Sequence, residues 1–96
     1  MSILVREGNP LRKPEVWLRQ ADNENVVYDP ATSAVHILNA TATAIWVLCD
    51  GETTPDEMVE AICELSGLPN EVVVEDLRRI LLQFEEADIL TWTGTT

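Results

Sequence analysis

The chain has 96 residues, enough for one domain with a single hydrophobic core and too few for two. It carries 17 acidic residues against 6 lysines and arginines, and the net charge of −11 opposes binding to nucleic acid or to anionic lipid. Hydrophobic residues make up 46% of the chain, yet no apolar run approaches the roughly 18 residues of a membrane span and no signal-peptide pattern opens it. We therefore expect a cytoplasmic globular protein with neutral or basic partners.

The N-terminal part predicts a flexible arm followed by three short strands. Residues 1–15 contain Gly8, Pro10 and Pro14 without a hydrophobic period, and only Ile3–Val5 suggests extended structure. Strand-forming residues then cluster at 16–20, 26–28 and 34–38, and turn-forming residues separate these clusters. This spacing predicts an antiparallel meander of three strands.

The pattern changes to a helical period directly after the third predicted strand. Asn39 is a favoured N-cap residue, and Gly51 stands where a helix stop belongs. The apolar residues between them have helical spacing, at Ala42, Ile45, Leu48 and Cys49.

Two more helices follow with clear signals of their own. The run Thr54-Pro55-Asp56-Glu57 predicts a capping box, and Ser66-Gly67 predicts the end of that helix. Its expected buried stripe is Met58, Val59, Ile62, Cys63 and Leu65. The last helix starts near Pro69-Asn70, and its apolar face is Val73, Leu77, Ile80, Leu81 and Phe84. Residues 89–92 suggest a final extended piece. The fold class is therefore α+β, with a three-stranded antiparallel sheet followed by three helices, and we expect a domain over residues 16–92 with a tail at 93–96.

The sequence offers no set of residues for catalysis or metal binding. His36 is the one histidine, and the two cysteines, Cys49 and Cys63, fall at apolar helix positions typical of reduced core thiols. No Cys-x-x-Cys pair, His-x-x-x-His pair or glycine-rich phosphate loop is present. We expect no enzyme activity, no metal and no cofactor.

Two other functional classes share features with this chain. Three strands packed with three helices are typical of winged helix-turn-helix regulators, but acidic residues surround Arg78 and Arg79 on the last helix. Small acidic carrier proteins modify a serine at the start of a helix, whereas Ser66 stands at a helix end. Both classes remain alternatives.

The run Leu38-Asn39-Ala40-Thr41-Ala42-Thr43-Ala44-Ile45-Trp46-Val47-Leu48-Cys49-Asp50-Gly51 resembles the signature of the coenzyme PQQ synthesis protein D (PqqD-like) family. The closing pattern, with Asp76-Leu77 and then Ala87-Asp88-Ile89-Leu90, is similar to that family as well. The resemblance covers roughly residues 16–90. It implies a winged helix-turn-helix-like recognition element for ribosomally made, modified peptides (a RiPP recognition element). Such a protein binds the leader of a precursor peptide, in PQQ, lasso-peptide or similar biosynthesis. It presents the precursor to a modifying enzyme, either a radical SAM enzyme or a leader peptidase and cyclase.

The resemblance also implies where the leader lies. It adds as an extra strand beside the third strand, whose edge is Ser33, Ala34, Val35, His36, Ile37 and Leu38, and it lies in a groove against the third helix. We expect that groove along Val72, Asp76, Arg79, Ile80 and Gln83, or else along the other flank at Val74, Arg78 and Leu81. Within the strand, Val35 and Ile37 are expected to face the core. An exposed edge allows a monomer or a strand-swapped homodimer.

Overall fold

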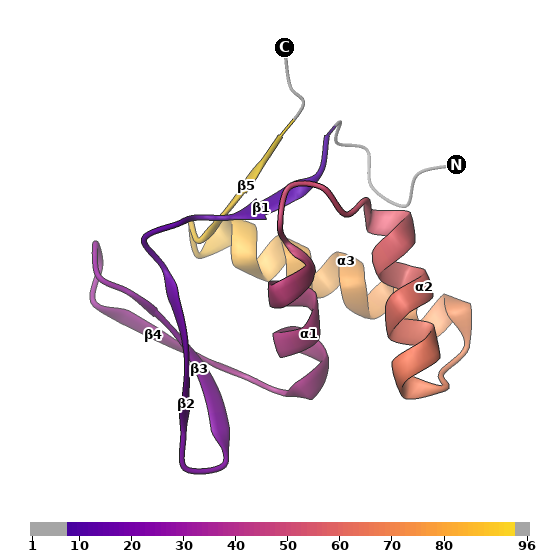
Figure 1. Ribbon diagram of the computed structural model, residues 1–96, viewed down its shortest axis with the longest axis horizontal. Coiled ribbons are helices and arrows are strands. Elements are labelled where there is room, and N and C mark those ends of the chain that lie inside the picture. The colour runs from indigo at the N-terminus through magenta and orange to yellow at the C-terminus, as the bar shows by residue number, and fades with distance from the viewer. Residues whose placement is uncertain (1–7, 94–96) are drawn as a thin grey trace.

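The structure is a computed structural model that describes residues 8–93. The α+β prediction, a three-stranded antiparallel sheet followed by three helices, is confirmed (Figure 1). In chain order the elements are β1 (Pro10–Arg12), β2 (Trp17–Ala21), β3 (Glu24–Asp29), β4 (Ala34–Leu38), α1 (Ala40–Leu48), α2 (Pro55–Ser66), α3 (Asn70–Glu86) and β5 (Leu90–Trp92).

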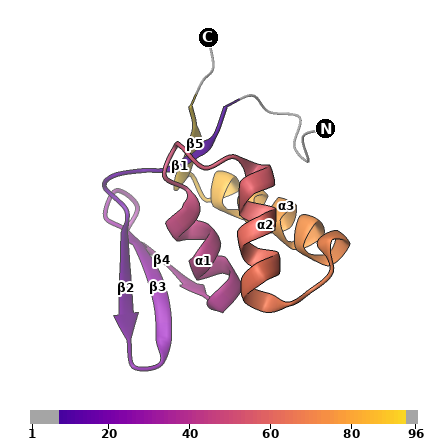
Figure 2. The ribbon, with the colours of Figure 1, turned by 45° about the vertical axis from the view of Figure 1, so that its right-hand side comes forward.

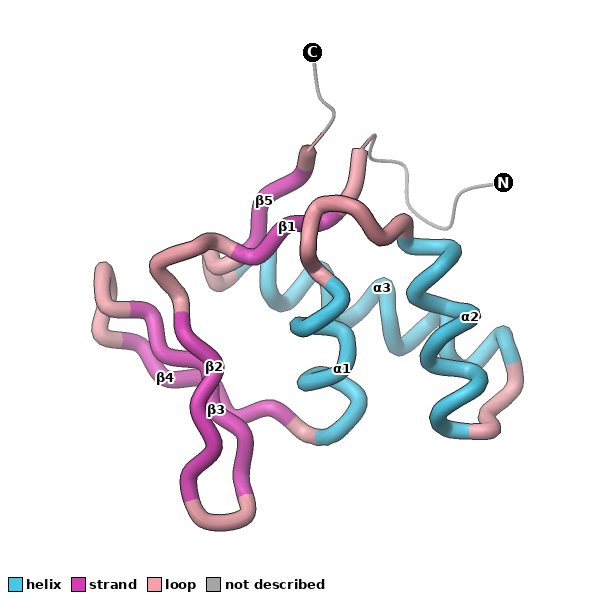
Figure 3. Tube along the Cα trace, viewed as in Figure 1, coloured by secondary structure: helices cyan, strands magenta, loops and turns pink. Residues whose placement is uncertain are grey.

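The larger sheet is an antiparallel meander in the order β2-β3-β4, as Figure 3 shows in magenta. Its register pairs Trp17 with Tyr28 and Val26 with Ile37. Because the strand order follows the chain order, β2 and β4 form the two edges of this sheet. The helices lie to one side of it, and β4 leads directly into α1 (Figure 1).

The expectation of a loose arm over residues 1–15 is wrong for its described part. Pro10–Arg12 form β1, which pairs antiparallel with β5 at the other end of the chain. The Arg12 N–H also donates to the Cys49 carbonyl at 2.8 Å. Sequence patterns miss this strand because it is only three residues long and its partner is about 80 positions away. The extended piece expected at Ile3–Val5 lies outside the described residues.

The expected orientation of β4 is also wrong. Val35 and Ile37 are 58% and 66% exposed, whereas Leu38 is buried at 8% and His36 is half-buried. His36 lies opposite the fully buried Val27, so this side of β4 faces the helices. β4 carries apolar residues on both faces, and alternation alone therefore leaves its orientation undecided. The orientation is set by Leu38, which packs into the core immediately before α1 begins.

The helix start signals are confirmed at α1 and α2. The Asn39 side chain accepts a hydrogen bond from the Ala42 N–H at 2.8 Å. Thr54 and Glu57 form the reciprocal capping box, with distances of 3.1 and 2.9 Å. These bonds satisfy backbone donors that the first turn of a helix leaves without partners. They explain why both boundaries are readable in the sequence.

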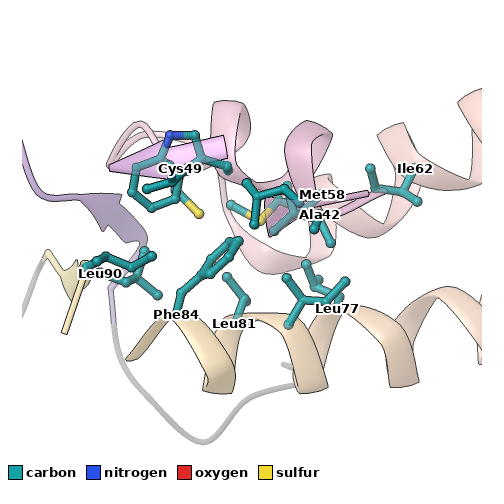
Figure 4. Close-up of a cluster of buried hydrophobic side chains, with 14 of the residues drawn as sticks. Ala42, Cys49, Met58, Ile62, Leu77, Leu81, Phe84 and Leu90 are labelled. Atoms are coloured by element: carbon teal, nitrogen blue, oxygen red, sulfur yellow. The ribbon is translucent and has the colours of Figure 1, made fainter. Parts of the chain in front are cut away.

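The core lies between α1, α2 and α3, and all five residues of the expected α3 face are buried. Figure 4 shows Leu77, Leu81 and Phe84 of α3 pointing toward the side chains of α1 and α2. Trp46 of α1 meets Phe84 in an edge-to-face contact, with ring centroids 5.3 Å apart. This contact fixes α1, and with it the end of β4, against the C-terminal half of α3.

Two expectations about the helices need correction. Leu65 is 77% exposed instead of buried, because the apolar stripe of α2 runs past its packing partners at the end of the helix. There it borders a cleft of about 240 Å³ between α1 and α2. α1 ends at Leu48 with Cys49 as its C-cap, so Gly51 lies beyond the cap that we expected it to form.

Gly51 instead makes a tight turn against β1 and the residue after β5. Its φ is +82°, and an added Cβ would lie 3.2 Å from Leu11 and 3.3 Å from Thr93. Gly67 has a similar φ of +72° but open space around it. We expect Gly51→Ala to lower the free energy of unfolding by about 2–3 kcal/mol, against about 1–2 kcal/mol for Gly67→Ala. Urea unfolding of both variants measures the difference, and equal losses would contradict the close approach at Gly51.

Candidate functional site

β4 offers an open sheet edge. Among residues 8–93 its one strand partner is β3, so one side of its backbone lacks a partner strand. The β2-β3 hairpin has a two-residue loop, Asp22-Asn23, and its closing pair Ala21–Glu24 therefore exchanges hydrogen bonds. Hydrogen-bonded pairs alternate along the ladder, so the backbone N–H and C=O of Val26 point toward β2. Those of the next residue, Val27, therefore point toward β4.

The same alternation divides the backbone of β4 into two sets. His36 lies opposite Val27, so its N–H and C=O point toward β3. The backbone groups of Val35 and Ile37 then point away from β3, to the open edge. These two residues are also those with exposed side chains. The open edge of β4 thus presents unpaired backbone groups at Val35 and Ile37.

A cleft of about 380 Å³ lies beside this edge. It separates β4 from the C-terminal end of α3 and the segment that follows; Figure 2 shows β4 running to the start of α1. The residues around the cleft come from these two segments: Val35, His36, Ile37, Leu38, Gln83, Phe84, Ala87 and Ile89. None of them is Asp, Glu, Lys or Arg, so the cleft is near neutral in a protein of net charge −11.

His36 and Gln83 supply the polar groups of the cleft. The Nε2 atom of His36 is buried and has no hydrogen-bond partner within the described chain. Gln83 is exposed on the α3 side. Phe84 and Ile89, which are buried, supply apolar surface between them. The cleft can therefore hold apolar side chains and still offer a few hydrogen-bonding groups.

Only the C-terminal end of the predicted α3 groove lies close to β4. Gln83 borders the cleft, and Ile80, one turn earlier, is buried in the core. Asp76 and Arg79 form an exposed ion pair with each other at 3.2 Å, as helical spacing suggests. Val72 is exposed at the start of α3, about 16 Å along the helix from Gln83.

The alternative flank of α3 does not reach the cleft. Leu81 is buried in the core at 1% exposure, and neither Val74 nor Arg78 borders the cleft. On the β4 side, Ser33 precedes the strand and has a φ of +60°, so it belongs to the turn. Ala34 begins β4 and is half-buried.

Sequence reasoning missed Phe84, Ala87 and Ile89 as cleft residues. Phe84 was expected in the core, where most of its ring does lie, and the other two belong to the closing segment after α3. The turn at Asp88 positions that segment. Asp88 has a φ of +61° and pairs with Lys13 at 2.6 Å, and this contact raises the pKa of Lys13. Lys13 thus connects the loop after β1 to the rim of the cleft.

The remaining reactive groups are located in packing positions. Burial raises the pKa of the Cys49 thiol to about 12, against a smaller opposing effect of Arg12, so this thiol stays protonated near neutral pH. Cys63 is half-buried and donates to Asn70 at 3.2 Å. Residues 8–93 contain no cluster of three His, Cys, Asp or Glu side chains suited to a metal ion. None of the helices in this part of the chain combines the length and apolarity that a bilayer crossing requires.

Comparison with known families assigns the fold that surrounds this edge. The family model for coenzyme PQQ synthesis protein D (PqqD) matches residues 24–90, from the start of β3 to the start of β5. The chain belongs to the PqqD family. The match includes β4, all three helices and every residue that borders the cleft. β1 and β2 precede the matched PqqD region.

Two solved structures resemble this PqqD-family chain over nearly their whole length. One is TbiB1 in complex with the TbiA(beta) leader peptide, which is 27% identical, with a TM-score of 0.74 over 90% of this chain and 98% of that one. The other is lasso peptide synthetase B1 complexed with the leader peptide, with 17% identity and a TM-score of 0.76 over 86% and 98%. A search of curated proteins found no match. The resemblance to the PqqD family is thus confirmed.

Proposed function

We propose that this protein is a non-catalytic RiPP recognition element, which binds the leader segment of a ribosomally made precursor peptide. The observation that carries the proposal is the open edge of β4 beside the neutral cleft against α3. An open edge accepts an extended peptide through backbone hydrogen bonds, and a neighbouring cleft selects its side chains. TbiB1, 27% identical to this chain, forms a complex with a leader peptide, which supports the same class of ligand here.

Both parts of the site are needed for useful affinity. Pairing along β4 makes about four or five backbone hydrogen bonds, worth roughly 2–7 kcal/mol in total before the entropy of association is subtracted. Micromolar binding requires about 8 kcal/mol. Apolar leader side chains must therefore enter the cleft between β4 and the end of α3. The proposed binding site combines residues 35–38 of the predicted edge with Gln83 of the predicted groove. It also includes Phe84, Ala87 and Ile89, which border the cleft.

With the leader bound, the protein acts by bringing the precursor close to a separate modifying enzyme. That enzyme is a radical SAM enzyme or a leader peptidase and cyclase, and holding its substrate nearby raises the effective concentration. The net charge of −11 disfavours the winged-helix regulator alternative, because DNA binding needs a basic surface. The carrier alternative has no support, since Ser66 lies at the end of α2 and donates back to the Ile62 carbonyl.

The test is a titration of a fluorescently labelled leader peptide, taken from a short precursor gene beside the gene for this chain. We expect saturable binding at tens of micromolar or tighter, without strong salt dependence, because the cleft is neutral. A scrambled leader of the same composition is the matched control. Equal binding of both peptides, or no saturation with the native leader, would contradict the proposal.

A further inference from the structure

The β2-β3-β4 sheet has a second face, which none of the helices within residues 8–93 covers. Cross-strand pairing places eight side chains on this face. They form two three-strand rows, Trp17–Tyr28–Val35 and Arg19–Val26–Ile37, and the pair Ala21–Glu24 next to the hairpin turn. Trp17, Val35 and Ile37 are more than half exposed, and Tyr28 and Val26 are half-buried. The rings of Trp17 and Tyr28 are in contact, with centroids 5.7 Å apart. We call the six residues of the two three-strand rows the outward face.

The composition of the outward face is unusual for a sheet surface that is exposed to solvent. An antiparallel sheet with one solvated face normally alternates apolar and polar residues, whereas five of the six residues in the two three-strand rows are aromatic or aliphatic. Contiguous exposed apolar patches of this kind mark interaction surfaces. Trp, Tyr and Arg, all present here, are also the residues that dominate binding energy at protein interfaces.

The charge around the outward face narrows the choice of partner. Arg19 is the one charged residue within it, in a protein of net charge −11. Exposed acidic residues stand at its ends, with Glu15 before β2 and Asp22 and Glu24 at the β2-β3 turn. A complementary surface is therefore apolar at its centre and basic at its rim. A second copy of this chain would bring a like charge of −11 and fits poorly.

The outward face is continuous with the edge where the leader is proposed to bind. A strand added to β4 presents every second side chain to the same face, beside Val35 and Ile37. The protein and its bound peptide thus form one four-stranded surface. An enzyme bound to that surface would contact the protein and the leader at the same time. The part of the precursor peptide beyond the paired segment would stay free for modification.

We infer that the outward face is the docking surface for the modifying enzyme, and that this enzyme recognises the composite sheet of protein and leader. The inference rests on the proposed function. Its consequence is coupling: because the leader completes the surface, leader and enzyme each increase the affinity of the protein for the other. The contact surface of the enzyme is apolar with a basic rim.

The experiment measures two affinities separately, for the leader and for the radical SAM enzyme or leader peptidase encoded beside this chain. The test variant is Trp17→Thr, which keeps a strand-forming residue and lies two strands from the β4 edge. The matched control is Leu65→Gln, since Leu65 is a still more exposed apolar side chain on α2. We expect Trp17→Thr to weaken enzyme binding at least about tenfold. Leader affinity should stay within about twofold, and Leu65→Gln should change neither affinity.

The outcomes separate the two proposals. If the leader does not bind the unaltered protein, the proposed function fails. If the leader binds but the enzyme binds Trp17→Thr as well as it binds the unaltered protein, the docking surface is wrong. Absence of enzyme binding to the leader-loaded protein also overturns it. Light scattering would show whether the unaltered protein forms a dimer. If it does, and Trp17→Thr abolishes the dimer, the outward face binds a second copy of this chain instead.

Discussion

Trp46→Ala is expected to lower the free energy of unfolding by about 3–5 kcal/mol, which is a large part of the stability of a small domain. Trp46 is 1% exposed and packs edge-to-face on Phe84, so its removal leaves a cavity between α1 and α3. The loss also loosens the support behind β4, because α1 follows that strand directly. Urea unfolding monitored by circular dichroism measures the change.

The matched control is the same substitution at Trp17, which is 53% exposed. Trp17→Ala removes a ring of equal size but only the contact with Tyr28, so we expect a loss of about 1 kcal/mol. A loss below about 1.5 kcal/mol for Trp46→Ala, or equal losses at the two positions, would contradict the packing of α1 on α3.

Ile37→Pro is expected to abolish most leader binding while leaving the protein folded. The N–H of Ile37 points to the open edge of β4, where proline removes a donor that only the leader would use. The lost hydrogen bond and the bulk of the ring together should weaken binding at least about tenfold. Titration of the labelled leader measures this, and circular dichroism reports whether the fold survives.

His36→Pro is the matched control for that prediction. The N–H of His36 points toward β3, so its loss should instead destabilise the sheet itself. Normal leader binding by a folded Ile37→Pro protein would exclude strand addition at this edge. If both variants unfold, leader peptides N-methylated at alternate positions test the same hydrogen bonds from the other side, and equal binding of every methylated peptide would exclude the pairing.

Much of the fold was predictable because its signals are local. Asn39 and the Thr54–Glu57 capping box mark helix starts by hydrogen bonds to their own first turns, and the α3 face follows from helical spacing. The pairing of β1 with β5 is different in kind. It joins Pro10–Arg12 to Leu90–Trp92 across nearly the whole chain, and no local pattern encodes such a partner.

The candidate site was predictable in outline, and its details depend on tertiary packing. The resemblance to the PqqD family indicated the β4 edge and a groove against α3, but it left open which flank of α3 faces β4. The structure places Gln83, on one of these two flanks, beside the cleft. It could not orient β4, since Val35, Ile37 and Leu38 are all apolar and only the packing of Leu38 decides between the faces. That one orientation turns Val35 and Ile37 from expected core residues into the most exposed part of the edge, and it creates the outward face.

The most direct test of the leader-binding account is amide hydrogen exchange of β4 with and without saturating leader. In the free protein, the His36 amide should exchange slowly because β3 protects it, whereas the Val35 and Ile37 amides should exchange fast. Strand addition at this edge predicts that the leader slows amide exchange at Val35 and Ile37 at least about tenfold and changes exchange at His36 little. Saturable leader binding that leaves exchange at Val35 and Ile37 unchanged would contradict it.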